Sequence, residues 1–438
     1  MQEPTMSLST TLGRKPPVRN LQANKAVVAT VIGNGLEWFD FTVYSFFSVV
    51  IAKVFFPSEN ELTSYLLALA TFGVGFFMRP VGGIVLGVYG DRHGRKAALS
   101  LTILLMALGT LIIALTPGYA QIGLAAPALI VIARLLQGFS AGGEMGSATA
   151  FLTEHAPVGR KAYYSSWIQA SIGLAVAIGA GFGATLSALL TPEQLESWGW
   201  RIPFLLGSLI GPIGFYIRSR IDETPVYEQA ERAHSPLSEV VSIYPRQTLI
   251  SFSMVVLWTV CTYAVLFYIP SYATRVLQLS STVGFTAGIV GGLILLVATP
   301  LVGLMADRHG KRPWLLGSAI AIFIAALPLF TLINLWPGLL SLLLFEVLMG
   351  LLIAGYLGGL LAAFGELLPT RVLSTGLSVA YNLAVTIFGG FATFTVTWLI
   401  AATGSNLAPA FYIMFAAAVS AFGASLFHDA PRQTGDRQ

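Results

Sequence analysis

The feature that most constrains this chain is a series of long apolar runs separated by short polar segments. A helix that crosses a membrane needs about 20 largely apolar residues. Twelve runs of about this length can be traced, at 27–52, 62–90, 97–116, 121–153, 160–188, 198–219, 245–275, 282–305, 312–334, 337–367, 371–401 and 406–427. They do not alternate with a period of two, which argues against an outer-membrane barrel. We therefore expect an all-α integral membrane protein with twelve transmembrane helices.

Composition excludes the other broad classes. Of the 438 residues, 55% are hydrophobic and 10% are charged, whereas a soluble domain carries about 25% charged residues. Disorder requires low hydrophobicity and high charge, so a disordered chain is excluded as well. The net charge is only +4, with no basic stripe beside exposed aromatic residues, so we expect no nucleic-acid partner. The single cysteine, Cys261, is expected to be a small buried residue.

The distribution of positive charge predicts the orientation in the membrane. If the N-terminus is cytoplasmic, 19 of the 24 Lys and Arg residues fall in cytoplasmic segments. Lys and Arg concentrate on the cytoplasmic side of membrane proteins, so we expect both termini inside a bacterial cytoplasmic (inner) membrane. The polar segment 1–25 followed by a very long apolar run does not resemble a signal peptide.

The chain divides into two similar halves. A ten-residue segment at 87–96 has the pattern Gly-x-x-x-Asp-Arg-His-Gly followed by two basic residues, and it recurs at 303–312, 216 residues later. Parallel repeats of this kind build transporters with a substrate site between the halves, near the middle of the membrane. The predicted division is a cytoplasmic tail at 1–26, a six-helix half at 27–219, a cytoplasmic loop at 220–244, a second six-helix half at 245–427 and a tail at 428–438.

The duplicated loop resembles the signature of the major facilitator superfamily. More specifically, the chain is similar to its metabolite–proton symporter family, through segments at 33–41, 77–83, 134–144, 198–204, 381–382 and 388–390. The resemblance covers essentially the whole chain and implies two six-helix halves related by a pseudo-twofold axis. Members carry citrate, tricarballylate, 2-oxoglutarate, shikimate or proline and betaine. The short loop at 220–244 and the short C-terminus resemble the organic-acid members.

The two copies of the loop predict a cytoplasmic gate. The carboxylates of Asp91 and Asp307 can pair with an arginine or a helix N-terminus across the gap between the halves. The resemblance implies that such a latch closes the outward-facing state. The alternative is that these residues merely anchor the loops on the inner side. The expected gate residues are Asp91, Arg92, Arg95, Asp307, Arg308 and Lys311.

Charges inside the spans are the strongest local signal, because each costs at least about 2.5 kcal/mol and is a functional hypothesis by default. Glu37, Asp40 and Glu144 are the expected proton-coupling residues. Burial raises the pKa of a carboxyl group and a nearby arginine lowers it again, so an acid beside Arg134 would act as a proton switch. The freed guanidinium could then bind a substrate carboxylate. A static ion pair is the alternative, and Glu144 could instead be a structural partner of a loop cation.

Other intramembrane charges and polar residues are candidates for the substrate site. Arg79 could contact substrate or only brace the neighbouring loop, and Glu346 is a weaker candidate because it lies near the start of its span. A polar residue in a span often only forms a hydrogen bond to a neighbouring helix. Spaced glycines such as Gly138 and Gly142 are expected to allow helices to pack closely. The expected substrate-binding residues are Tyr44, Arg79, Arg134, Gln137, Gln169, Tyr268, Tyr381 and Asn382.

Together these patterns predict a transporter, not an enzyme. The function expected is proton-coupled uptake of an organic anion such as citrate, tricarballylate or another di- or tricarboxylate, by a functional monomer in the lipid bilayer. No nucleotide-binding loop or metal-ligand cluster is found in the sequence, so we expect no cofactor or metal, with protons as the coupling ion. Alternatives are a carrier of proline, betaine or a shikimate-like acid, a substrate sensor, and a drug exporter of the same fold. An osmolyte carrier would favour an aromatic cage for the ammonium group.

Overall fold

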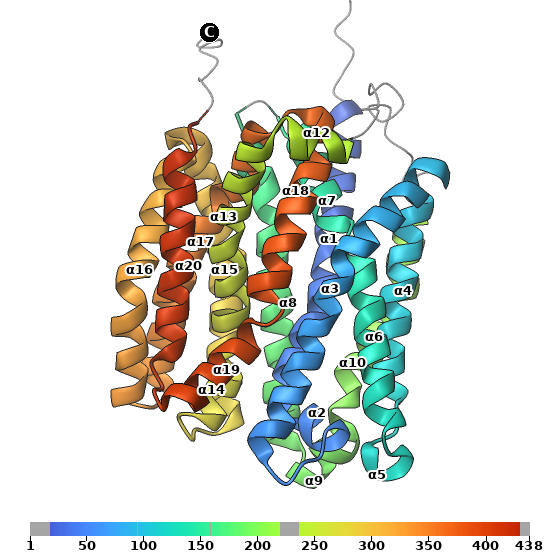
Figure 1. The fold of residues 1–438 in the computed structure, drawn as a ribbon, viewed down its shortest axis with the longest axis vertical. Coiled ribbons are helices and arrows are strands. Elements are labelled where there is room, and N and C mark those ends of the chain that lie inside the picture. The colour runs from blue at the N-terminus through green and yellow to red at the C-terminus, as the bar shows by residue number, and fades with distance from the viewer. Residues whose placement is uncertain (1–17, 94, 158, 220–235, 430–438) are drawn as a thin grey trace, which may run out of the picture.

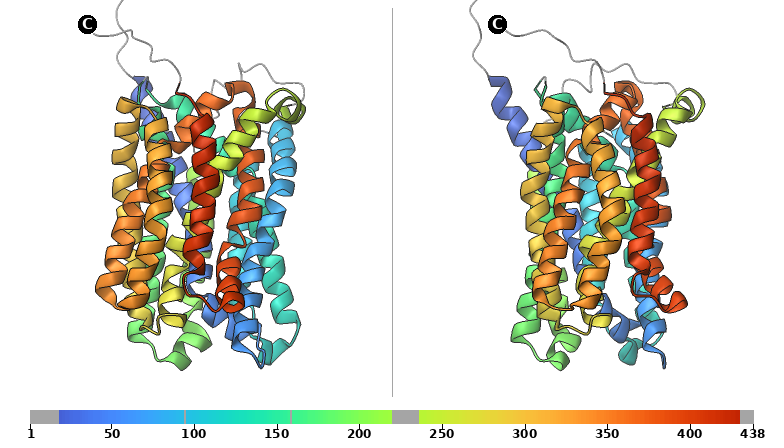
Figure 2. Two further views of the ribbon diagram at one scale, coloured as in Figure 1. Left: turned by 60° about the vertical axis from the view of Figure 1, so that its left-hand side comes forward. Right: turned by 90° about the vertical axis from the view of Figure 1, so that its left-hand side faces the viewer.

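The structure is a computed structural model that describes residues 18–93, 95–157, 159–219 and 236–429. Within these ranges the chain is helical and contains no strand. Long helices run side by side along one axis (Figures 1 and 2). The chain enters α1 (Val18–Phe46) and leaves α20 (Ala408–Leu426) at the same end of the bundle, the upper end in Figure 1, which we call the termini end.

The first half of the chain fills the first six predicted ranges. The first range is broken, because α1 and α2 meet at a bend of 64° around Phe47. The fourth is divided between α6 and α7 at the pair Gly142 and Gly143. The helices of this half after α1 are α2 (Ser48–Phe55), α3 (Glu61–His93), α4 (Arg95–Leu115), α5 (Tyr119–Ile122), α6 (Ala125–Ala141), α7 (Glu144–His155), α8 (Lys161–Leu189), α9 (Pro192–Gln194), η1 (Leu195–Gly199) and α10 (Arg201–Ser219).

The second half fills the remaining six ranges. Its seventh and eleventh ranges each contain a short wider turn, η2 and η3, between two α-helical pieces, which changes the direction of the side chains locally. Its elements before α20 are α12 (Pro236–Ser242), α13 (Pro245–Cys261), η2 (Thr262–Phe267), α14 (Ile269–Arg275), α15 (Ser281–His309), α16 (Arg312–Leu335), α17 (Leu339–Leu367), α18 (Thr370–Ala384), η3 (Val385–Gly389) and α19 (Ala392–Thr403).

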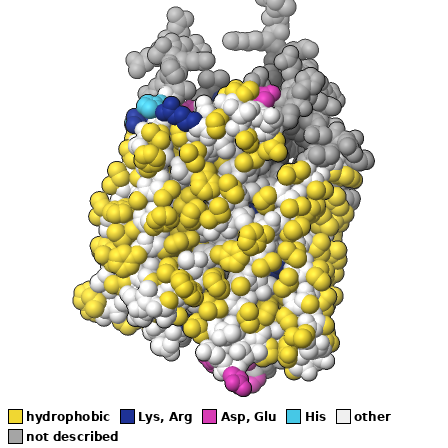
Figure 3. Space-filling view, viewed as in Figure 1, with side chains coloured by type: hydrophobic (Ala, Val, Ile, Leu, Met, Phe, Trp, Pro, Cys, Tyr) yellow, Lys and Arg dark blue, Asp and Glu magenta, His cyan; other side chains and the backbone are white. Residues whose placement is uncertain are grey.

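The surface is that of a protein that crosses a membrane many times. In the described part, nine helices are long and apolar enough to span a bilayer, and the bent pair α1–α2 makes ten. The remaining two predicted ranges hold the shorter apolar helix of α4 and helix α10. Hydrophobic side chains cover the middle of the face in Figure 3, and charged ones lie toward its ends. The all-α membrane fold predicted from the sequence is confirmed.

The two halves meet along two seams. On one side α15 packs against α8, and on the other α18 and α19 pack against α3, with α18 also touching α7. At the first seam the backbones come very close, because a Cβ on Gly173 of α8 would lie 2.6 Å from the carbonyl oxygen of Gly292 of α15. Parts of α1 and α3 therefore lie against η2, η3, α18 and α19 of the second half.

Glycines also set the position of α6 against α3. A Cβ on Gly138 would lie 1.7 Å from the carbonyl oxygen of Gly75, and one on Gly142 would lie 1.9 Å from that of Arg79. No side chain fits at either place, so the predicted glycine series packs one backbone directly on another. This contact brings the α3 and α6 arginines into one region of the bundle.

Candidate functional site

Two arginines are buried near the same aromatic ring, because the Cζ atoms of Arg79 and Arg134 lie 5.0 and 6.0 Å from the centre of the Phe41 ring. Arg79 on α3 and Arg134 on α6 are each 1% exposed. Among the described residues, none of the three guanidinium nitrogens of Arg134 has a hydrogen-bond partner. Arg79 donates one long hydrogen bond, 3.4 Å from Nη1 to the Tyr381 hydroxyl, while its Nε and Nη2 have no such partner in the described ranges. Buried cations are normally paired, so this arrangement is costly unless an anion completes it.

Aromatic rings hold the two guanidinium groups. The Cζ atom of Arg134 lies 3.6 Å from the centre of the Tyr44 ring, and that of Arg79 lies 4.4 Å from Phe76 and 5.0 Å from Phe41. A cation over a ring gains about 0.5–2 kcal/mol, but it leaves the N–H donors at the edge of the guanidinium group unused. The rings therefore fix the arginines and leave their donors available to a ligand.

The second half contributes the facing wall. The Tyr263 ring of η2 lies 5.4 Å from Phe76 and 6.0 Å from Trp38, centre to centre. The ring of Tyr381 of α18 lies tilted against that of Trp258 of α13, with centres 4.8 Å apart. The hydroxyl group of Tyr263 is buried and has no hydrogen-bond partner among the residues described. A small molecule held here would touch both halves.

Asp40 is buried in a hydrogen-bond chain behind this site. It is 4% exposed, and its Oδ2 accepts a hydrogen bond from the Thr110 hydroxyl. The Gln137 amide in turn donates to the Thr110 oxygen at 2.8 Å. Asp40 and Arg134 interact electrostatically, yet they form no hydrogen-bonded ion pair within the described ranges. Asp40 and Arg134 are thus close enough to interact, as expected, but Asp40 is bonded to Thr110 and Arg134 lies over the Tyr44 ring.

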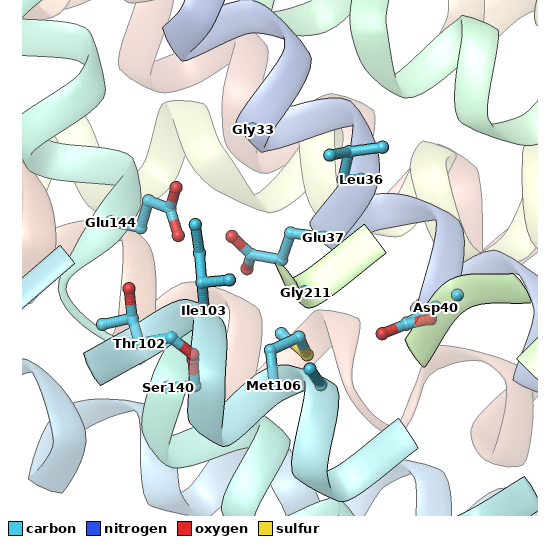
Figure 4. Close-up of a pocket in the computed structure, with 12 residues that line it drawn as sticks. Gly33, Leu36, Glu37, Asp40, Thr102, Ile103, Met106, Ser140, Glu144 and Gly211 are labelled. Atoms are coloured by element: carbon cyan, nitrogen blue, oxygen red, sulfur yellow. The ribbon is translucent and has the colours of Figure 1, made fainter. Parts of the chain in front are cut away.

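Three predicted proton-coupling carboxylates line one pocket with a cavity volume of about 40 Å³ (Figure 4). Glu37 and Glu144 are half-buried and point toward one another in the figure, and Asp40 lies on the far side of Met106. No three His, Cys, Asp or Glu side chains of the described chain gather as metal ligands. The lining residues are Gly33, Leu36, Glu37, Asp40, Thr102, Ile103, Met106, Ala107, Ser140, Glu144, Gly207 and Gly211.

The remaining predicted substrate residues are distributed around the seams. Asn382 donates a 2.8 Å hydrogen bond to the carbonyl oxygen of Gly142, which joins the halves. Tyr268 accepts a hydrogen bond from Thr397 at 3.1 Å, within the second half. Gln169 of α8 is fully buried, and its amide atoms have no partner in the part of the chain described. The structure does not join Tyr268 or Gln169 to the arginines by a direct contact.

Glu346 lies apart from the arginine site. It is fully buried in α17, and among the described residues neither carboxyl oxygen has a hydrogen-bond partner. The carboxyl group faces α15, where a Cβ on Gly291 would lie 2.2 Å from Oε2.

One of the two predicted gate loops is described at the level of side chains. The Asp307 carboxylate accepts hydrogen bonds from the backbone N–H groups of Ala162 and Tyr163, both at 2.9 Å, at the start of α8 in the other half. Lys311 forms a 2.6 Å ion pair with Glu366, and Arg308 is exposed. The structure does not describe the side chains of the predicted gate residues in the first half, which are Asp91, Arg92 and Arg95.

The opposite end of the bundle is also closed between the halves. The Cζ atom of Arg275 lies 4.4 Å from the centre of the Tyr65 ring, which links α14 to α3. The Ser45 hydroxyl donates to the carbonyl oxygen of Phe267 at 3.4 Å. The halves therefore touch toward both ends of the described bundle, and the two arginines are buried.

Several members of the site carried no clear sequence signal. Thr110 appears in the sequence as one hydroxyl in an apolar span, and only its position beside Asp40 gives it meaning. Phe41, Phe72 and Phe76 read as ordinary core residues. The spacing of Phe72 and Phe76, one helical turn apart in the span that carries Arg79, was the signal that could have located them.

The fold and the chain match known transporters. The model of the Major Facilitator Superfamily matches residues 30–393. The chain is 38% identical over 395 residues to the citrate-proton symporter of Klebsiella pneumoniae, covering 90% of this chain and 89% of that protein. It is 34% identical over 409 residues to the proline/betaine transporter of Escherichia coli K12, covering 90% and 81%.

A solved structure of the xylose transporter XylE from E. coli, in a partially occluded inward open conformation, has the same fold. It superimposes with a TM-score of 0.76 at 16% identity, over 95% of this chain and all of that one. The family match and the close relatives confirm the resemblance seen in the sequence motifs. The chain belongs to the major facilitator superfamily and, within it, to the metabolite–proton symporter family.

Proposed function

We propose that this protein takes up an organic acid, a di- or tricarboxylate such as citrate or tricarballylate, together with protons. The observation that carries the proposal is the pair Arg79 and Arg134, buried near the Phe41 ring with five nitrogens that no described residue bonds. A carboxylate binds a guanidinium group through two parallel hydrogen bonds. Two such groups in one enclosed site fit a ligand with more than one carboxylate. The citrate-proton symporter relatives support this assignment.

Proton coupling would work through Asp40. While ionised, Asp40 partly neutralises the field of Arg134, with which it interacts electrostatically. Protonation removes that negative charge, so Arg134 attracts an anionic substrate more strongly. Release of the proton would weaken substrate binding in turn. The Thr110 hydroxyl and the Gln137 amide hold the carboxyl group in place during this cycle.

Transport would follow alternating access. The contacts of Asp307 with α8 close the termini end, and those of Arg275 and Ser45 close the other. Breaking one set while keeping the other would expose the arginines to one side only. We place both termini in the cytoplasm of a bacterium, with a monomer in the inner membrane, two six-helix halves at 27–219 and 245–427, and protons as the coupling ion without further cofactors.

A zwitterionic osmolyte is the second candidate. The rings of Trp38, Phe41, Phe72 and Tyr263 form part of the same enclosure, and aromatic faces bind quaternary ammonium groups. One arginine could take the carboxylate of such a ligand. The proline/betaine transporter relatives favour this reading, whereas the second buried arginine counts against it.

Uptake by the purified protein in proteoliposomes decides between the two. The test supplies radiolabelled citrate, tricarballylate, 2-oxoglutarate, shikimate and proline, with and without an inward proton gradient. We expect accumulation of one or more polycarboxylates that requires the gradient. Accumulation of proline alone would overturn the organic-acid assignment, and accumulation without a gradient would overturn proton symport.

A further inference from the structure

The pocket that holds the three carboxylates is built from one half of the protein. Its lining residues come from α1, α4, α6, α7 and α10, and no described residue after 219 contributes. Arg79 and Arg134 do not line it either. The pocket is therefore lined by the first half alone, and it holds the three acids but neither arginine.

An acidic oxygen without a protein partner faces this pocket. Asp40 is 4% exposed, and within the described ranges its Oδ1 has no hydrogen-bond partner. In Figure 4 its carboxyl group points toward Met106, with Glu37 and Glu144 beyond. An oxygen so placed can exchange a proton with water in the pocket, while Oδ2 stays bonded to Thr110.

The pocket runs from Asp40 toward the termini end. On α1 its lining extends from Asp40 back to Gly33, about 10 Å along a helix axis. On α4 it extends from Ala107 back to Thr102, in the same direction, since α4 begins at that end. Glu144 begins α7, which continues to the termini end. Asp307 joins the halves at this end through α8, whereas the pocket extends toward the same end inside the first half.

Small residues keep the space open. The pocket includes Gly207 and Gly211 of α10, and a Cβ on Gly207 would lie 2.5 Å from the Asp40 Oδ1. Any larger residue there would intrude on the carboxyl group. By the same measure a single water needs about 10–15 Å³, so a cavity of about 40 Å³ that is lined in part by carboxylates and hydroxyls has room for a few water molecules.

We propose that this pocket is the path by which the proton leaves Asp40 toward the termini end, through Glu37 and Glu144, while substrate passes between the halves. The inference rests on the proposed function. The O–H bond of protonated Asp40 breaks, water in the pocket takes the proton, and a carboxylate is left; Glu37 and Glu144 pass the proton on.

The charged and titratable groups around this path are few. Arg134 of α6 acts on Asp40. Arg79 of α3 acts on Glu37, as do Tyr263 and Tyr381 of the second half. The residues that α4 and α10 contribute to the lining carry no charge. The two cations therefore stand on the substrate side of the acids, where they favour movement of a proton away from the substrate site.

The first test fills the pocket. Ile103 lies between the carboxylates in Figure 4, and Leu104, the next residue of α4, is 47% exposed on the outer surface of the bundle. The variants are Ile103→Phe and, as matched control, Leu104→Phe. Each is assayed for gradient-driven accumulation and for counterflow, in which labelled substrate exchanges without net proton release.

The expected result is that Ile103→Phe loses gradient-driven accumulation but keeps counterflow, and that Leu104→Phe keeps both. Equal accumulation in Ile103→Phe and wild type would overturn the path, as would joint loss of both activities in a folded Ile103→Phe protein, because the pocket would then serve the substrate. If wild type itself accumulates no organic acid, the proposed function fails instead.

The second test needs no variant. Hydroxyl-radical labelling of the wild-type protein marks buried side chains that touch water. We expect Met106, which lines the pocket, to be oxidised much faster than Met254 and Met349, which are fully buried elsewhere. Oxidation of Met106 no faster than that of the other two would show a dry pocket and overturn the path.

Discussion

The guanidinium carbon of Arg134 lies 3.6 Å from the centre of the Tyr44 ring. The tyrosine is itself held in place, because its hydroxyl donates to the carbonyl oxygen of Ala68 at 3.1 Å. The arginine is thus positioned by the face of a ring instead of by a carboxylate. An incoming anion can bind the guanidinium group without displacing a carboxylate. A site that must bind substrate and then release it requires this property.

Replacing either arginine by lysine should weaken substrate binding. Lysine keeps the charge but lacks the planar guanidinium group that binds a carboxylate through two parallel hydrogen bonds. A hydrogen bond to a charged group contributes about 1.5–3 kcal/mol, or about 10- to 150-fold in affinity. We expect Arg79→Lys and Arg134→Lys each to raise the KM for uptake by that order. Arg246→Lys, at an exposed position of α13, is the control; equal KM values in all four proteins would refute the assignment.

Removing the Asp40 charge should uncouple substrate movement from the proton gradient. In Asp40→Asn the amide oxygen can still accept the bond from Thr110, so the local packing is kept. We expect counterflow to persist and gradient-driven accumulation to disappear, because the residue can no longer bind and release a proton. Accumulation that survives in Asp40→Asn at the wild-type level would exclude Asp40 as the carrier.

Two carboxylates that cap helices at the termini end offer a matched pair. Asp307 caps α8 across the gap between the halves, whereas Asp429 accepts from the N–H groups of Lys311 and Arg312 within the second half. Loss of such a cap costs about 0.5–2 kcal/mol. We expect Asp307→Ala to open the termini end and Asp429→Ala to lower stability without opening it.

Labelling can measure that opening. Ser378 of α18 faces α7, since a Cβ on Gly146 would lie 2.3 Å from its hydroxyl oxygen. A Ser378→Cys probe in a Cys261→Ser background should react with a maleimide faster in the Asp307→Ala protein than in the Asp429→Ala protein. Equal labelling rates would mean that Asp307 does not latch the halves.

Close backbone packing predicts a sharp difference between two glycines. A methyl group on Gly138 would meet the Gly75 carbonyl oxygen at 1.7 Å, whereas one on Gly181 meets nothing within 4 Å. Overpacking typically costs about 1–3 kcal/mol. Gly138→Ala should lower the melting temperature markedly, and Gly181→Ala should leave it unchanged or raise it slightly. Similar melting temperatures would contradict the close contact of α3 and α6.

Much of the architecture was readable from the sequence because apolar length and charge placement are global signals. The twelve ranges, the duplicated loop and the costly intramembrane charges of Asp40, Arg79 and Arg134 all follow from them. The bend at Phe47 was not predictable, since the apolar pattern runs through it unbroken. Local wide turns such as η2 likewise leave no mark on hydropathy.

The partners of each site residue were harder to predict than its presence. Pairing of an acid with Arg134 was expected from charge alone, but Asp40 bonds Thr110 and Arg134 lies over Tyr44. Which face of a helix meets which neighbour depends on the glycine contacts at Gly138 and Gly75, and these require the three-dimensional arrangement. The separate pocket in the first half could not be seen in the sequence for the same reason.

The most direct measurement of the central claim is the melting temperature of the purified protein with candidate ligands. A ligand that binds the folded state at 100 times its Kd stabilises it by about 2.7 kcal/mol. If Arg79 and Arg134 bind the carboxylates of the substrate, citrate or tricarballylate should raise the melting temperature of the wild type. This shift should vanish in the double variant Arg79→Lys, Arg134→Lys. A shift caused by proline or betaine alone, or an acid-induced shift that survives in the double variant, would contradict the account.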